Sequence, residues 1–194
     1  DVFLNALPNF NAFGFVCGSL IPLVKGTSQV VLPTFMPPEA AMEAMRNAAV
    51  TIVPAVPTII SLLLGTVARG ITPPRSLRYI LSGGDRLPLD FDKRSQDYLG
   101  VPVIEGYGLT EAASVVSIAP GIENRKAGSV GTLLSCVEAQ IRNDEGNVLP
   151  AGSEGHLWIR GDNVAKCYYR NPELTSQRFV DGWFDTCDIA RFDG

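Results

Sequence analysis

Between residues 28 and 107, short apolar runs alternate with longer segments of helical spacing, and this alternation limits the fold more than any other feature. Strands separated by helices imply βαβ units, in which each connection returns the chain to a parallel neighbouring strand. We therefore expect an α/β fold with a parallel sheet flanked by helices. The predicted strands cover residues 28–33, 51–55, 77–84 and 101–108, and the predicted helices cover residues 37–49, 56–70 and 87–100.

The texture of the sequence changes after about residue 120. Residues 137–161, VEAQIRNDEGNVLPAGSEGHLWIRG, contain two alternating runs around a turn-rich centre, which is typical of antiparallel β-structure. We predict an α/β subdomain over residues 1–124 and a small antiparallel β subdomain over residues 125–194. The final residues, Asp193 and Gly194, form a dipeptide common in hairpin turns, so we expect the chain to be an internal fragment, truncated at its C-terminal end.

Charge and composition exclude several kinds of function. The chain carries a net charge of -4 with scattered Lys and Arg, which offers no electrostatic footprint for nucleic acid. The apolar runs near residues 12–24 and 55–64 are shorter than the roughly 20 residues that cross a bilayer, so we expect core helices and no transmembrane segment. Four cysteines without a CxxC pair and one histidine, His156, cannot assemble a zinc site. We expect a cytoplasmic protein, with membrane association of the full-length protein as an alternative.

Two glycine-marked strand ends are the candidate binding site. In parallel sheets, ligands collect at the carboxyl ends of the strands, where helix amino termini also point. Gly83 and Gly84 follow one predicted strand, and residues without a Cβ let a planar ring lie against the backbone. In the stretch EGYGLTE, residues 105–111, Tyr107 offers a stacking face and Glu111 a hard oxygen ligand for Mg²⁺. Together these ends predict a nucleotide pocket.

Each of these patterns also has an ordinary explanation. A Gly-Gly pair after a strand is usually only a turn, and a Thr-Glu pair before AASVV is typical of a helix start. The chain contains no GxxxxGK[ST] phosphate loop, and GYGLTE differs from the dinucleotide motif because its last position is Glu. Spacing alone therefore leaves the function open.

A set of motifs in a fixed order is more specific. SGGDRL, EGYGLTE, GSVGTLL, EGHLWIRGDNVAKCYYRNPELT and FVDGWFDTCDIARFDG resemble the adenylate-forming superfamily of acyl-CoA synthetases, luciferases and peptide-synthetase adenylation domains. LPNFNAFGF, residues 7–15, resembles the LPxFHxxGF motif of the same family, so the resemblance spans nearly the whole chain. The chain is thereby expected to be part of the large N-terminal domain of such an enzyme.

The resemblance implies a two-step reaction. A carboxylate attacks the α-phosphate of ATP to give an acyl-adenylate and pyrophosphate, and a thiol then displaces AMP. The run CYYRNPELT is similar to the MKGYYxNPExT texture of medium- and long-chain fatty-acid ligases and related acyl-carrier-protein synthetases, which implies a fatty acid as substrate. The family resemblance implies CoA as co-substrate and Mg²⁺ as metal. The expected partners are a small-molecule carboxylate, ATP and CoA. The alternatives are an acyl-carrier-protein synthetase, a peptide-synthetase adenylation domain, and a non-catalytic relative used as a binding module.

The family motifs also imply roles for individual residues. Tyr107 would stack on adenine, and Glu105 would border the amino edge of the ring. Thr110 would hydrogen-bond the α-phosphate and Glu111 would hold Mg²⁺, so these two are the predicted catalytic residues. Asp188 would accept hydrogen bonds from the ribose hydroxyls. The predicted nucleotide contacts are Gly83, Gly84, Asp85, Glu105, Gly106, Tyr107 and Asp188.

Two positions depart from the family pattern. Cys187 stands where the family usually has the glycine of TGD, and its side chain either crowds the ribose or points away. Asn11 stands where many relatives have His, in a segment that lines the acyl pocket. For apolar residues such as Phe13 and Phe15, ordinary helix packing is the competing explanation. The predicted substrate pocket consists of Asn11, Phe15, Val56, Pro57, Ile60 and Gly108.

Some family elements have no counterpart in the 194 residues. The Ser/Thr/Gly-rich phosphate loop would precede Asp1, and the small C-terminal domain with its lysine would follow Gly194. We therefore expect that this chain by itself does not catalyse the overall reaction. His156 occupies a position where relatives often have Glu, so we expect a residue on a strand surface rather than a catalytic base.

Overall fold

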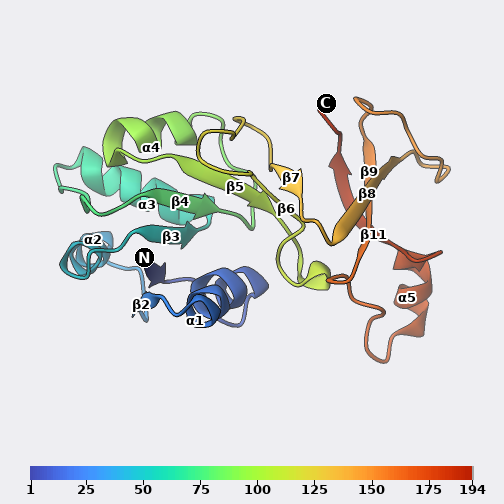
Figure 1. Cartoon of the computed structure of the whole chain (residues 1–194), viewed down its shortest axis with the longest axis horizontal. Coiled ribbons are helices and arrows are strands. Elements are labelled where there is room, and N and C mark those ends of the chain that lie inside the picture. Colours follow the sequence, from blue (N-terminus) through green and yellow to red (C-terminus); the bar gives the residue numbers. More distant parts are fainter. Residues whose placement is uncertain (194) are drawn as a thin grey trace. The chain divides into compact units, whose positions relative to one another are not determined.

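The computed structural model describes residues 1–193 and separates the chain into two compact units. The first unit contains residues 1–110 and 114–132, and the second contains Glu111–Ala113 with the residues from Leu133 onward. The predicted fold class is confirmed, because the first unit has a mostly parallel sheet with helices and the second has a small antiparallel sheet (Figure 1). The boundary expected between residues 124 and 125 falls inside the first unit.

The sheet of the first unit contains seven strands among the described residues, in the order β2-β1-β3-β4-β5-β6-β7. The strands from β2 to β5 in this order are parallel, whereas β6 is antiparallel to β5. The four predicted strands are confirmed as β2, β3, β4 and β5. The sequence pattern does not predict β1, because its four residues show no alternation. The bounds are β1 (Val2–Asn5), β2 (Ser28–Val31), β3 (Ile52–Ala55), β4 (Tyr79–Ser82), β5 (Val103–Tyr107), β6 (Ser117–Ile118) and β7 (Thr132–Leu133).

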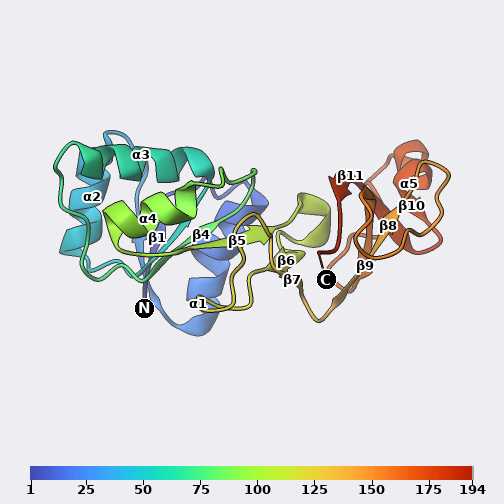
Figure 2. The same cartoon turned by 90° about the horizontal axis from the view of Figure 1, so that it is seen from above.

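Three helices pack against one face of this sheet, and two shorter ones lie on the other face (Figure 2). The helices α2 and α3 carry proline in their first turn, where its fixed φ suits a helix and its missing N–H leaves no bond unmade. Helix α4 stops at Gly100, whose φ of 74° gives a left-handed C-cap. The first three are α2 (Pro38–Asn47), α3 (Pro57–Ala68) and α4 (Phe91–Leu99), and the shorter two are η1 (Gly14–Leu20) and α1 (Ile21–Lys25).

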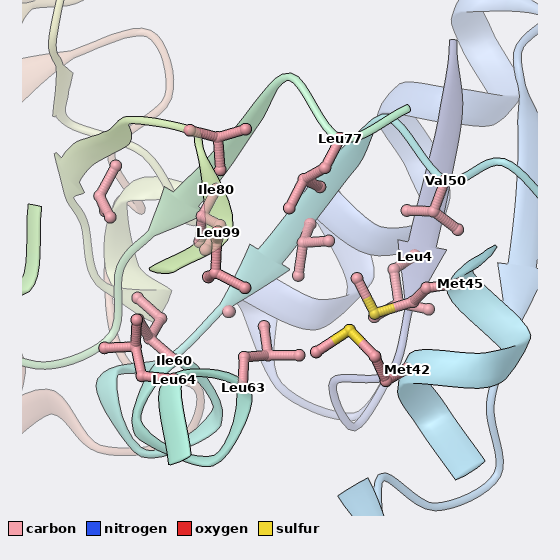
Figure 3. Close-up of a cluster of buried hydrophobic side chains, with 14 of the residues drawn as sticks. Leu4, Met42, Met45, Val50, Ile60, Leu63, Leu64, Leu77, Ile80 and Leu99 are labelled. Carbon is pink, nitrogen blue, oxygen red and sulfur yellow. The ribbon is translucent and has the colours of Figure 1, made fainter. Parts of the chain in front are cut away.

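The main hydrophobic core lies between the sheet and the helices α2, α3 and α4 (Figure 3). Leu4 of β1 and Ile80 of β4 are fully buried there, together with Met42 and Met45 of α2 and Leu63 of α3. Successive side chains of a strand point to opposite faces. Ile80 therefore points into this core, and the next residue of β4 points to the opposite face, where the candidate site lies.

The apolar segment near residues 12–24 only partly matches the core helix that its composition predicts. Cys17 is buried, but Leu23 and Val24 of α1 are 72% and 73% exposed. The second apolar segment does contain a core helix, α3, with Ile60 and Leu64 buried. Within residues 1–193, no helix combines the length and the hydropathy required to cross a membrane.

The second unit is built on four antiparallel strands in the order β10-β11-β9-β8, counted among the described residues. The predicted antiparallel pair is confirmed as β8 and β9, which pair from Val137 opposite Gly161 to Arg142 opposite His156. The pairing of β11 with β9 shifts register between Asp185 and Ile189, which marks a β-bulge. The elements are β8 (Val137–Arg142), β9 (Gly155–Gly161), α5 (Pro172–Arg178), β10 (Phe179–Val180) and β11 (Trp183–Ala190).

Candidate functional site

The register between β4 and β5 aligns the two glycine-marked strand ends. Leu81 pairs with Ile104 and Ser82 pairs with Glu105 in parallel orientation. The residue after Ser82 is Gly83 and the residue after Glu105 is Gly106, so the two glycine-marked strand ends lie side by side. This is the sheet edge at which parallel α/β folds bind ligands.

A cavity of about 180 Å³ opens at these strand ends. All of its lining residues belong to the first unit. They come from the loop that leads into η1, from the end of β4, and from the end of β5 with the turn that follows. The lining is formed by residues 11–13, 81–84, 106–110 and 114–115, with Cys17 and Ile118.

Seven of the residues predicted from the sequence line this one cavity. They include the stacking candidate Tyr107, the phosphate-binding candidate Thr110 and the two strand-end glycines. The convergence supports the predicted pocket without testing the role of any one residue. The seven are Asn11, Gly83, Gly84, Gly106, Tyr107, Gly108 and Thr110.

The other predicted residues lie elsewhere. Ile60 is fully buried in the main core, Phe15 is 50% exposed, and Pro57 begins α3. Val56 does not line the cavity, but its side chain lies next to Gly84, which does. A Cβ added to Gly84 would lie 3.4 Å from the Cγ1 atom of Val56. Asp85 and Glu105 are not among the residues that line the cavity, and Glu111 and Asp188 belong to the second unit.

Two glycines keep the cavity and its turn open for different reasons. A Cβ on Gly108 would lie 1.6 Å from the carbonyl oxygen of Ser114, so no larger residue fits without moving the backbone. A Cβ on Gly83 would lie 3.4 Å from the Phe13 ring and 3.6 Å from the Gly106 oxygen, which is ordinary contact distance. Gly108 is therefore needed for the local fold, whereas a substitution at Gly83 would mainly fill space beside the cavity.

Nine of the sixteen lining residues were not predicted from the sequence, and three of these, Phe13, Ser82 and Ser114, bear on what the cavity can bind. Phe13 lies on the wall rather than in a helix core. Ser82 and Ser114 also line it, and their Oγ atoms are buried without a hydrogen-bond partner. Buried hydroxyls normally have partners, so both positions are unusual. Strand alternation directs the Ser82 side chain to the face of Ile80 rather than to that of Leu81. The position of Ser82 beside the Gly-Gly pair is a signal that could have found it, whereas Ser114 reaches the wall only through the turn after β5.

Asn11 and Glu105 each have a local environment that limits what they can do. The Oδ1 atom of Asn11 accepts a hydrogen bond of 2.8 Å from the Phe13 N–H, so this side chain shapes the loop at the cavity rim. Burial raises the pKa of the Glu105 carboxyl, a hydrogen bond from the Gly128 N–H lowers it, and the charge of Asp92 raises it further. The net result is a raised pKa, which makes Glu105 easier to protonate than an exposed glutamate.

Glu111 is anchored within the second unit. Its Oε1 atom accepts a hydrogen bond of 2.7 Å from the Tyr168 hydroxyl, and its backbone carbonyl accepts one of 2.7 Å from the Ala165 N–H. Burial raises the pKa of Tyr168 to about 12, and the hydrogen bond to Glu111 acts in the same direction. Tyr168 is therefore a protonated donor at neutral pH.

The described residues fit Mg²⁺ in one particular mode. No group of three or more His, Cys, Asp or Glu side chains gathers anywhere in residues 1–193, so they form no protein cage for a metal. Mg²⁺ is commonly held by one or two carboxylates together with water and substrate phosphates. Glu111 suits that mode as a single hard oxygen donor. His156, which the sequence places on a strand surface, lies on β9 with Nε2 at 2.9 Å from Asp144 Oδ1.

Asp188 follows a strained residue in the bulge of β11. Cys187 has a φ of 64°, in the left-handed region that a side chain with a Cβ disfavours. Glycine at this position would be the residue expected for such a bulge. The Cys187 side chain is exposed, with Sγ at 3.6 Å from Asp185 Oδ2. Its N–H donates to Asp185 Oδ1 at 2.9 Å, which holds the bulge in place.

Comparison with known proteins identifies similar sequences and structures. The family model described as AMP-binding enzyme matches residues 1–169. The chain is 34% identical to feruloyl-CoA synthase from Amycolatopsis over 98% of its own length, and 26% identical to a long-chain-fatty-acid–CoA ligase from Haemophilus influenzae over 97%. The structure of O-succinylbenzoate coenzyme A synthetase from Bacillus subtilis, in complex with ATP and magnesium ion, covers the whole chain with a TM-score of 0.85 at 29% identity.

These relatives are considerably longer than the chain. The chain spans 39% of the Amycolatopsis protein, 34% of the Haemophilus protein and 40% of the Bacillus structure. The relatives are also named for different acids, among them ferulate, long-chain fatty acids and succinylbenzoate.

The strain at Cys187 leads to a stability prediction. We expect Cys187→Gly to raise the free energy of unfolding by about 1 kcal/mol, because glycine adopts a φ of 64° without the Cβ clash. The measurement is urea unfolding followed by circular dichroism. Cys136→Gly is the matched control, since Cys136 is also exposed but is not among the residues with positive φ, and it should lower the same free energy. Equal losses in both variants would contradict the account of the bulge.

Proposed function

Because the chain belongs to the AMP-binding enzyme family, we propose that it supplies the nucleotide and acid pocket of an AMP-forming acid–CoA ligase. The single observation that carries this proposal is the cavity in which Gly83, Gly84, Tyr107 and Thr110 meet. Glycines leave room for a flat base against the backbone, an aromatic ring can cover its other face, and a hydroxyl can reach a phosphate. These are the parts required to bind AMP.

The proposed reaction has two steps. A carboxylate oxygen of the acid attacks the α-phosphorus of ATP, the bond to pyrophosphate breaks, and an acyl-adenylate forms. The sulfur of CoA then attacks the acyl carbon, loses its proton, and displaces AMP as the leaving group. Both steps depend on positioning and on stabilising charge, so the absence of a nucleophilic triad from the motifs is consistent with them.

In this reaction each site residue has a proposed role. The Thr110 hydroxyl donates a hydrogen bond to the α-phosphate, and the Tyr107 ring stacks on the adenine. The Asp188 carboxylate accepts hydrogen bonds from the ribose hydroxyls. The β-bulge at Cys187 sets the direction of its side chain in this proposal. Glu111 is the proposed ligand of Mg²⁺, which when bound would neutralise phosphate charge. The roles of Glu111 and Asp188 rest on the motifs EGYGLTE and TCD alone.

Two classes of acid are candidates. The CYYRNPELT texture favours a fatty acid. A compact aromatic or otherwise polar acid is the second candidate. It is favoured by the similarity to feruloyl-CoA synthase and O-succinylbenzoate coenzyme A synthetase, and by the unpartnered Ser114 hydroxyl among the lining residues.

The thiol acceptor is proposed to be CoA. An acyl carrier protein or a peptide-synthetase carrier domain is the alternative within the family, and a binding module without catalysis is the alternative outside it. We also propose that the 194-residue chain alone binds nucleotide without completing the reaction, because the phosphate loop and the catalytic lysine of the family motifs are not in its sequence.

Nucleotide binding can be tested on the chain itself. We expect Gly83→Ala to weaken AMP binding at least about tenfold while the chain stays folded, because the new methyl fills space next to the ring of Phe13 at normal contact distance. Isothermal titration calorimetry with AMP measures the affinity, and thermal unfolding measures the fold. Gly65→Ala in α3 is the control, since its Cβ would contact only Arg69 and should leave AMP binding unchanged. Equal affinities for AMP in the two variants would show that this cavity is not the AMP site.

The acid is tested in a full-length protein that contains this chain. Hydroxylamine traps the acyl-adenylate, so hydroxamate formation can be compared across saturated fatty acids and substituted cinnamic or benzoic acids. If Ser114 binds the acid, Ser114→Ala should lower the rate with hydroxylated aromatic acids about tenfold and leave fatty acids little changed. The reverse pattern, with fatty acids preferred and Ser114→Ala without effect, would select the fatty-acid class.

A further inference from the structure

The side chain that holds Glu111 is placed by ring and backbone contacts within the second unit. The Tyr168 hydroxyl donates a hydrogen bond of 2.7 Å to Glu111 Oε1. Its ring meets the edge of the Phe179 ring at a centroid distance of 5.6 Å, and Phe179 packs against Phe184 at 4.7 Å. Thr175 of α5 accepts a hydrogen bond of 3.0 Å from the Tyr168 N–H. The hydroxyl is thus fixed by contacts on its ring and on its backbone.

The backbone of Glu111 is held from the same side. Ala165 donates its N–H to the Glu111 carbonyl at 2.7 Å, and the Asn163 side chain donates to the Ala112 carbonyl at 3.0 Å. The chain then leaves through Ala113 and Ser114, whose φ values of 51° and 87° are unfavourable for residues with a Cβ. Such a conformation persists only where its surroundings impose it.

These contacts leave part of the Glu111 carboxylate available. Tyr168 occupies Oε1, and a carboxylate has about four lone-pair sites over its two oxygens. A hydrogen bond to one oxygen restricts the rotation of the group and still leaves Oε2 for a cation. This is the arrangement in which a neighbouring donor orients a metal-binding carboxylate.

We propose that Tyr168 is a positioning residue that orients the Glu111 carboxylate for a divalent cation bound with ATP. The inference rests on the proposed function, since it assumes that Glu111 binds the metal. Tyr168 does not touch the nucleotide in this proposal. It acts through the direction in which it holds Glu111.

The chain offers a matched control at the next position. Tyr169 is 83% exposed, so Tyr169→Phe removes a hydroxyl from an adjacent tyrosine that faces solvent. Tyr168→Phe keeps the ring and its contact with Phe179 and removes only the donor. Glu111→Gln tests the metal ligand itself.

The experiment measures metal binding rather than turnover. Mn²⁺ is titrated into the isotope-labelled 194-residue chain with excess ATP, and paramagnetic broadening of the amide resonances of residues 110–112 is followed by NMR. The wild-type chain and Tyr169→Phe should broaden at the same Mn²⁺ concentration. Tyr168→Phe should need about 10- to 100-fold more Mn²⁺, the usual effect of losing the donor that orients a ligand. Thermal unfolding shows whether each variant is folded.

The possible outcomes separate the two claims. If Glu111→Gln loses the broadening while Tyr168→Phe behaves like the wild type, Glu111 remains the metal ligand and the role of Tyr168 is refuted. If Glu111→Gln also behaves like the wild type, the proposed metal ligand is wrong and the inference is refuted with it. Should Tyr168→Phe unfold, Glu111→Asp breaks the same hydrogen bond by shortening the carboxylate arm, and an unchanged titration midpoint would refute the proposal.

Discussion

The parallel register of β4 with β5 is the constraint on which the candidate site depends. Ser82 pairs with Glu105, so the Gly-Gly pair after β4 stands beside Gly106 and Tyr107. A shift of one residue would turn the side chains of one strand to the opposite face. The register is stabilised by the core, because Ile80 and Val103 are neighbours in the pairing and both are buried beneath the helices. Core packing thus fixes the position of the binding edge.

The turn after β5 converts this edge into a cavity. Gly108 lies so close to the Ser114 carbonyl that the chain can fold back over the strand end only with glycine at this position. The N–H of Val116 donates to the Tyr107 carbonyl at 2.9 Å, which closes the turn. Between these points the chain passes through Thr110 and Glu111, one on the cavity wall and the other bound to Tyr168. The proposed phosphate contact and the proposed metal contact therefore belong to adjacent residues. Thr110 is positioned by the turn at the cavity, and Glu111 by its hydrogen bond with Tyr168.

The sequence predicts the architecture well because periodicity reports burial directly. The strands from β2 to β5 and the helices between them follow from apolar spacing, prolines at helix starts and glycines at helix ends. The short strand β1 is missed because four residues carry too little pattern. In the site, motifs identify the cavity wall at Gly83, Tyr107 and Thr110. They do not reveal Ser114 or Tyr168, because the positions of these two depend on a folded turn and on packing between distant segments. The strain at Cys187 is also a property of backbone geometry, although the missing glycine of the motif signals it.

The most direct test of the central claim is the position of AMP on the chain. A crystal structure of the 194-residue chain with AMP should show the adenine ring between the backbone at Gly83 and Gly84 and the ring of Tyr107. It should also show the α-phosphate within hydrogen-bonding distance of the Thr110 hydroxyl. AMP bound at any other surface, with the cavity between β4 and β5 left without nucleotide, would contradict the account.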